Sequence, residues 1–231
     1  MSKTDVEDYL DAAGACGPSL QWVSDLPESL DAEDIWGRCL RAEWMLWLLV
    51  YAKAPPAPLV KIFRDFLMRL LPVWEHRRSS IEECDQKGLF SKTLLDDAIA
   101  AFDALAGVVE CGEDPWSSVP YGQIRALSDD VDYRAVQRHV SSSFGAALAA
   151  VLDRANILLR GYEARNELAV LSTVADHVVS AVMYYEKSYR CAQTLLCEDI
   201  RNHVSGADMV KLMALTGQST LTLIRIDGRV E

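Results

Sequence analysis

Hydrophobic residues recur every three or four positions along most of this chain, which is the period of an amphipathic α-helix. The clearest series lies between Leu168 and Leu195, where steps of three and four residues form a heptad-like seam. A second series follows Asp130, which we interpret as a helix N-cap, and continues to about Leu159. The two series predict two long helices that pack as an antiparallel pair in the C-terminal half. The fold class expected from the pattern is all-α, a multi-helix bundle.

The N-terminal part differs from the rest because it is rich in tryptophan. Trp22, Trp36, Trp44 and Trp47 fall within 26 positions. The segment 41–52 has no polar face on its central turns, which predicts a helix that is buried on nearly all sides. Most of these tryptophans should therefore be core residues.

Two stretches rich in proline or glycine interrupt the helical pattern. Residues 53–58 contain three prolines and predict an extended break. Residues 107–123 contain two prolines and three glycines and predict the longest loop. This loop would separate an acidic, Trp-rich helical part over 1–106 from a long helical hairpin with a C-terminal element over 124–231. The alternative interpretation is one continuous domain.

The C-terminal segment departs from the helical period. From Thr220 to Val230, β-branched and apolar residues alternate around Asp227 and Gly228. This pattern predicts a short strand or hairpin. Any β structure is expected only at this end of the chain.

Length and composition indicate a globular protein. The chain has 231 residues, of which 50% are hydrophobic and 25% charged, which excludes a disordered chain. The first ten residues are polar and acidic, unlike a signal peptide. The longest apolar run, Trp44 to Ala52, is far too short to span a bilayer. Six cysteines without a CxxC pair predict reduced thiols, and we expect a cytoplasmic protein.

The net charge of −11 argues against direct binding of nucleic acid. Residues 1–34 have nine acids and one lysine, and residues 96–132 have nine acids and one arginine, so each stretch sums to −8. If both stretches lay on one face, they would attract a basic partner protein. The alternative is that these acids only cap helices and keep the surface hydrated.

The candidate partner-binding residues combine acids from both stretches with neighbouring tryptophans, because an indole ring beside exposed charge can anchor a protein partner. They are Asp25, Glu28, Asp31, Glu33, Asp34, Trp36, Glu113, Asp114, Trp116, Asp129 and Asp130.

Catalytic and metal-binding motifs are weak. Arg134 and His139 match the R-x4-H spacing of the all-helical HEPN ribonucleases, in which an arginine and a histidine act on the 2′-hydroxyl and the scissile phosphate. The pattern is short, and the alternative is a surface arginine beside a hydrogen-bonded histidine. His76 follows Glu75 directly, His177 follows Asp176 directly, and His203 stands five residues after Glu198, so we expect neither a metal site nor a cofactor from these pairs.

The run from residue 15 to 50 resembles the N-terminal pattern of small helical proteins of bacteria and phages that are labelled immunity proteins. The matching positions are Cys16, Leu20, Trp22, Trp36, Cys39, Ala42, Trp44, Leu46, Trp47, Leu48 and Leu49. The resemblance implies a shared fold element and a non-enzymatic, partner-binding role.

The leading functional hypothesis is therefore an inhibitor-like protein of phage or mobile-element origin. It would cover a basic or nucleic-acid-binding surface of another protein. The second hypothesis is the helical ribonuclease with Arg134 and His139. The third is a structural homo-oligomer that associates through seam residues such as Val178 and Val182.

Overall fold

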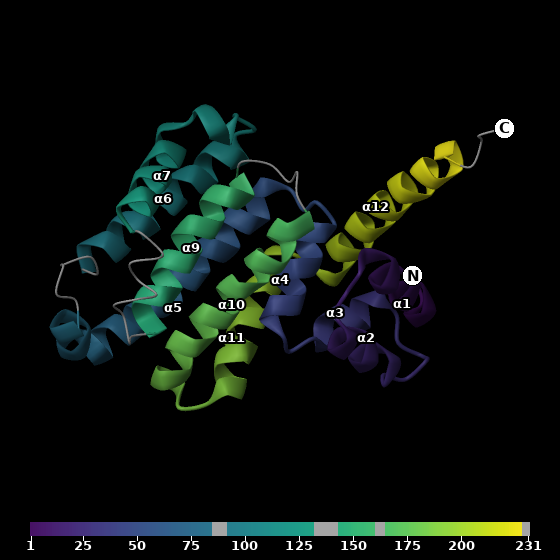
Figure 1. Ribbon diagram of the computed structural model, residues 1–231, viewed down its shortest axis with the longest axis horizontal. Helices are drawn as coiled ribbons and strands as arrows, with labels where there is room; N and C mark the ends of the chain where they lie inside the picture. The colour runs from purple at the N-terminus through teal and green to yellow at the C-terminus, as the bar shows by residue number, and fades with distance from the viewer. Residues whose placement is uncertain (85–91, 132–142, 160–164, 228–231) are drawn as a thin grey trace.

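The all-α fold is confirmed by the computed structural model shown in Figure 1. The structure describes residues 1–84, 92–131, 143–159 and 165–227. The chain is 83% helical, and the described part contains no strand. The expected multi-helix bundle is therefore present.

Three short helices form what we call the N-terminal unit: α1 (Lys3–Ala13), α2 (Gly17–Ser24) and α3 (Ala32–Arg38). The hydroxyl of Ser2 caps α1 by accepting a hydrogen bond from a backbone N–H of its first turn. Gly14 ends α1 with a φ of 73°, a left-handed conformation that favours glycine. Figure 1 shows this unit beside α4 and the start of the last helix.

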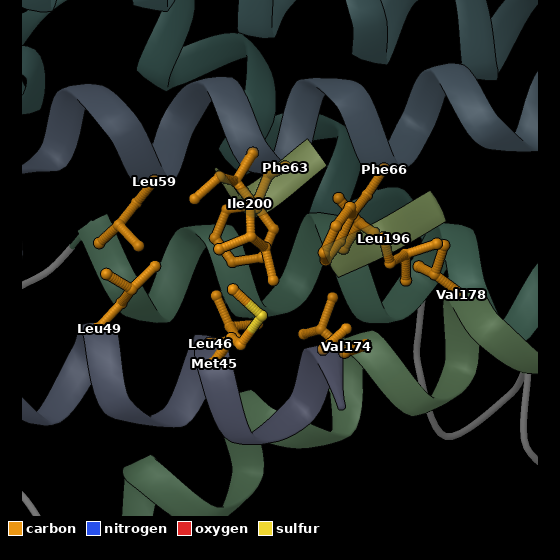
Figure 2. Close-up of a cluster of buried hydrophobic side chains, with 14 of the residues drawn as sticks. Met45, Leu46, Leu49, Leu59, Phe63, Phe66, Val174, Val178, Leu196 and Ile200 are labelled. Atoms are coloured by element: carbon orange, nitrogen blue, oxygen red, sulfur yellow. The ribbon is translucent and has the colours of Figure 1, made fainter. Parts of the chain in front are cut away.

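A central helix of the molecule is α4 (Ala42–Tyr51), which packs against α10 (Arg165–Glu186) and α11 (Tyr189–His203). Helix α5 (Pro56–Cys84) packs against the same two helices. The predicted burial of the segment 41–52 is confirmed, because its inward side chains are almost completely inaccessible. Among the described residues, side chains from both halves of the chain thus contribute to one hydrophobic cluster. The side chains labelled in Figure 2 are Met45, Leu46, Leu49, Leu59, Phe63, Phe66, Val174, Val178, Leu196 and Ile200.

The prediction of a loop over 107–123 is wrong. Helix α6 (Lys92–Glu110) runs past the first glycine of this stretch, and a single 3₁₀ turn, η1 (Pro115–Ser117), precedes α7 (Val119–Asp130). Pro120 lies in the first turn of α7, where its missing N–H costs no hydrogen bond. The proline that suggested a loop therefore marks the start of a helix.

The two predicted long helices are present in modified form. Asp130 is the last residue of α7, so its interpretation as a helix N-cap is wrong. Residues 132–142 lie outside the described residues. Helix α9 (Ser143–Leu159) contains the rest of the first predicted series and packs against α10. The seam predicted to continue to Leu195 is interrupted at Lys187, which has a φ of 56°. Ser188 then caps α11 by accepting from a backbone N–H, so the seam belongs to two helices.

The predicted C-terminal strand is also wrong. Helix α12 (Gly206–Asp227) includes most of the segment expected to be extended and projects from the bundle in Figure 1. A lone segment has no strand to pair with, whereas a helix satisfies its backbone groups internally. At Gly206 an added Cβ would lie 3.0 Å from the Cα of Glu33, so α12 begins in close contact with α3.

Candidate functional site

Five of the predicted partner-binding acids lie on the N-terminal unit. Asp25 follows α2, Glu28 lies in the connection to α3, and Asp31, Glu33 and Asp34 surround the start of α3. All five are exposed to solvent. The structure therefore gathers these acids at one end of the fold.

Three of these acids also stabilise the unit. Asp31 and Asp34 form a reciprocal capping box, in which each carboxylate accepts from the other's backbone N–H. The ammonium of Lys3 donates to Glu28 Oε1 and to the carbonyl oxygen of Ser24, both at 2.8 Å. The Lys3 side chain is buried, and its hydrogen bond with Glu28 raises its pKa.

Trp36 does not lie on this surface. Its side chain is 5% exposed, and its indole Nε1–H donates to the carbonyl oxygen of Val204 at 3.0 Å. The interpretation of Trp36 as a partner-binding anchor is therefore wrong for this conformation. The apolar face of α3 turns inward, and Trp36 attaches α3 to the residue that follows α11.

The second group of predicted acids lies elsewhere. Glu113, Asp114 and Asp129 are exposed near α6 and α7, and the side chains of Trp116 and Asp130 lie outside the described residues. In Figure 1, α6 and α7 lie at one end of the long axis, far from α2 and α3. The two acidic stretches therefore do not form one face.

The two stretches also differ in how their charge is neutralised. Within the described residues, the ion pairs of 1–34 all involve Lys3. Acids of 96–132 instead pair with bases of α5 and with a base of α6. These pairs are Lys61–Glu110, Arg64–Asp103 and Lys92–Asp96. The N-terminal unit therefore keeps more of its negative charge.

An apolar cavity of about 340 Å³ lies between the N-terminal unit, α4 and α12. The polar groups of its wall are few. Ser19 Oγ, for example, donates to the carbonyl oxygen of Cys16 at 2.7 Å, so it is already bonded within the wall. Its apolar wall includes Leu10, Trp22, Ile35, Trp47, Leu48 and Met213. We call this space the tryptophan cavity.

Aromatic rings surround the tryptophan cavity. The rings of Trp22 and Trp44 lie 5.9 Å apart, and the guanidinium of Arg41 lies 5.1 Å from the Trp44 ring. Trp47 stacks on Tyr51 with a centroid distance of 5.5 Å. All four rings are half-buried, so the wall reaches the surface as partly exposed aromatic area.

One buried carboxylate, that of Glu43, also lines the cavity. It forms an ion pair with Arg41, and its Oε2 accepts from Gln193 Nε2 at 3.0 Å. The Gln193 side chain also accepts from the Ala42 N–H at 2.9 Å and donates to the Tyr189 hydroxyl at 2.9 Å. Glu43 is therefore already bonded, and its network attaches the start of α4 to α11.

A second polar network joins α5 to α11. Arg69 donates two hydrogen bonds, of 2.9 and 2.7 Å, to the buried carboxylate of Asp199. One turn later, His203 Nε2 lies 2.7 Å from Asp65 Oδ2. Burial raises the pKa of Asp199, although Arg69 opposes the change. Because these groups bond to one another, the network fixes the packing of the two helices.

The sequence analysis raised three further kinds of site: a ribonuclease site, an oligomer interface and a metal site. Arg134 and His139 lie outside the described residues, so the ribonuclease hypothesis stays a prediction. The seam residues Val178 and Val182 are buried inside the chain, and a second copy cannot reach them in this conformation. Among the described residues, no group of three or more potential metal ligands occurs.

Over the described ranges, none of the helices combines the length and apolarity that crossing a bilayer requires.

Comparisons with protein families, curated proteins and solved structures gave no match. The resemblance of residues 15–50 to immunity proteins therefore stays a prediction.

The sequence pointed to the acids and the tryptophans, but it did not indicate the cavity. Trp22, Trp44 and Trp47 were expected to fill a core. The space arises because α12 supplies Met209 and Met213 to the wall, and these residues lie more than 160 positions after the tryptophans. The only local signal was the apolar spacing of these two methionines, which is ordinary for a helix.

Proposed function

We propose that this protein is a non-enzymatic, inhibitor-like binding protein that uses the acidic surface of the N-terminal unit to hold a basic surface of another protein. The single observation behind the proposal is the combination of largely unneutralised exposed acids with an aromatic, apolar cavity in one small unit. Exposed charge accelerates association, and an apolar pocket supplies affinity.

The charge distribution supports a basic partner. Asp25 and Glu33 are exposed, and neither takes part in the capping box or in the contacts of Lys3. Such a surface attracts cations over about one Debye length, roughly 8–10 Å in physiological salt. It repels the phosphates of nucleic acids, so the favoured partner is a basic protein, including one that itself binds nucleic acid.

The cysteines support a cytoplasmic location as part of the proposal. The cysteines within the described ranges, which are Cys16, Cys39, Cys111, Cys191 and Cys197, are all free thiols. Free thiols are typical of a reducing compartment. The resemblance of residues 15–50 to immunity proteins supports the same type of role.

Site-specific photo-crosslinking in host lysate tests this proposal. One variant has a photoreactive phenylalanine at position 33, and a matched variant has it at position 113; both positions are exposed acids. We expect a basic protein to crosslink at position 33 in nuclease-treated lysate and to be lost at 0.5 M salt. Crosslinks to the same protein with equal yield from position 113, or no salt effect, would contradict the proposal.

A further inference from the structure

The tryptophan cavity has a wall of a specific chemical type. Leu10, Ile35, Leu48 and Met213 give it aliphatic and thioether surface, and half-buried indole rings extend this surface to the exterior. An apolar space that reaches the surface is where an interface usually places its anchor side chain. The exposed acids described above lie on the N-terminal unit, which supplies part of this wall.

We propose that the cavity accepts one large apolar side chain, such as leucine, phenylalanine or tryptophan, from a lysine- or arginine-rich segment of the partner. This inference rests on the proposed function and specifies how the partner is recognised. The acids would attract the basic residues on both sides of the anchor, and the cavity would select the anchor.

The hydrogen bonding of the wall argues against a polar occupant. Ser19 Oγ donates to Cys16, the Trp36 indole N–H donates to Val204, and the Glu43 carboxylate bonds to Arg41 and Gln193. A polar group that entered would lose its bonds to water without finding new partners. A hydrocarbon side chain loses none.

The volume fits a large side chain. An apolar cavity of roughly 150 Å³ is sufficient for benzene, and this one is about 340 Å³. Met209 and Met213 form one wall, and the unbranched thioether chain of methionine adapts to occupants of different shape. Leucine, phenylalanine and tryptophan are therefore all acceptable anchors.

The rim favours basic residues beside the anchor. Asp11 is exposed and follows the wall residue Leu10, and Glu33 is exposed and follows the wall residue Ala32. Asp25 lies two positions after the wall residue Val23. The three helices that supply these wall residues, α1, α2 and α3, are thus also the elements on or next to which exposed acids lie. Charge complementarity commits the occupant to a basic segment.

Four synthetic peptides test the inference. Each has 15 residues, is rich in lysine, and differs only at the central position, which is alanine, leucine, phenylalanine or tryptophan. The affinity of the full-length protein is measured by fluorescence anisotropy at low and high salt. We expect the phenylalanine peptide to bind at least tenfold more tightly than the alanine peptide, because the cavity removes much more apolar surface of a phenyl ring than of a methyl group from water.

Substitutions in the wall test whether the preference for the phenylalanine peptide comes from the cavity. Ala32→Leu fills part of the space, and Trp22→Ala removes part of the wall at the exterior. In both variants the preference for phenylalanine over alanine should fall below threefold. Leu40→Ala is the control, since Leu40 is 40% exposed and does not line the cavity. Circular dichroism confirms that each variant is folded.

The outcomes separate the two proposals. Equal, salt-sensitive binding of all four peptides would overturn the cavity inference and leave the acidic surface supported. A preference that persists in both Ala32→Leu and Trp22→Ala would also overturn it. If none of the peptides binds, or if salt has no effect on any of them, the proposed function is wrong together with the inference.

Discussion

Two acidic regions of this protein have the same formal charge but different surroundings. Residues 1–34 and residues 96–132 each sum to −8. Around α5, acids of the second region meet Lys61 and Arg64, whereas the first region has only Lys3 among the described residues. Acid content along a sequence therefore does not identify a binding surface. What matters is which bases the fold brings to it.

The acids that contact α5 and the acids of the N-terminal unit also differ in burial. Around α5 the structure buries a carboxylate, Asp199, and satisfies it with two hydrogen bonds from Arg69. On the N-terminal unit the side chains of Asp25 and Glu33 stay exposed to water. We expect the first kind of acid to determine stability and the second kind to determine binding.

The substitution Asp199→Ala should have the largest effect, and it should lower the stability of the fold. Removing this carboxylate leaves the Arg69 charge partly buried without its partner, so the free energy of unfolding should fall by about 3 kcal/mol. Asp25→Ala is the matched control and should change it by less than about 0.5 kcal/mol. Urea unfolding measures both. Similar losses in the two variants would show that burial does not distinguish the stabilising Asp199 from the exposed Asp25.

Alkaline pH tests the junction between the N-terminal unit and α11. Burial raises the pKa of the Cys39 thiol, which directly follows α3, from its ordinary value of 9.0 to about 11. Because the folded pKa is the higher one, the contribution of this thiol to stability is complete below pH 9 and declines as pH rises towards 11. Between pH 7.5 and pH 10, Cys39→Ala should lose about 1 kcal/mol less stability than the wild type. Identical losses would mean that the thiol is accessible to water.

Trp36→Phe tests the attachment of α3 to the bundle. The substitution keeps an aromatic ring but removes the donor to the carbonyl oxygen of Val204, which leaves that oxygen buried and unpaired. The free energy of unfolding should fall by about 1 kcal/mol. Trp22→Phe is the control, since no hydrogen bond attaches the half-buried Trp22 to α11, and it should be nearly neutral. Chemical denaturation that ranks the two variants in the opposite order would contradict the role given to Trp36.

The smallest effect is expected for the ion pairs between α5 and α6. Lys61→Gln and Arg64→Gln break exposed pairs, so each should lower the free energy of unfolding by no more than about 0.5 kcal/mol. These pairs neutralise charge without supplying much stability. Losses above 1 kcal/mol in 0.15 M salt would show that they are structural.

Periodicity predicted the helical fold because burial of apolar faces determines it locally, as for the segment 41–52. The errors arose where tertiary context decides the outcome. Pro120 was read as a loop residue although it opens a helix, and the β-branched residues after Thr220 were read as a strand although no strand is available to pair with them. For the site, the exposed acids could be located in advance. The buried position of Trp36 and the cavity could not, because both depend on contacts with residues beyond position 200.

The most direct test compares two charge-reversed variants with equal net charge. One has Asp11→Lys, Asp25→Lys and Glu33→Lys in the N-terminal unit, and the other has Asp97→Lys, Glu113→Lys and Asp129→Lys near α6 and α7. All six positions are exposed.

The probe for both variants is the lysine-rich peptide with a central phenylalanine, and its association rate is measured at low and at high salt. We predict a loss of at least tenfold at low salt for the N-terminal variant and less than twofold for the other. Equal losses would show that only net charge matters and would contradict the assignment of the binding surface to the N-terminal unit.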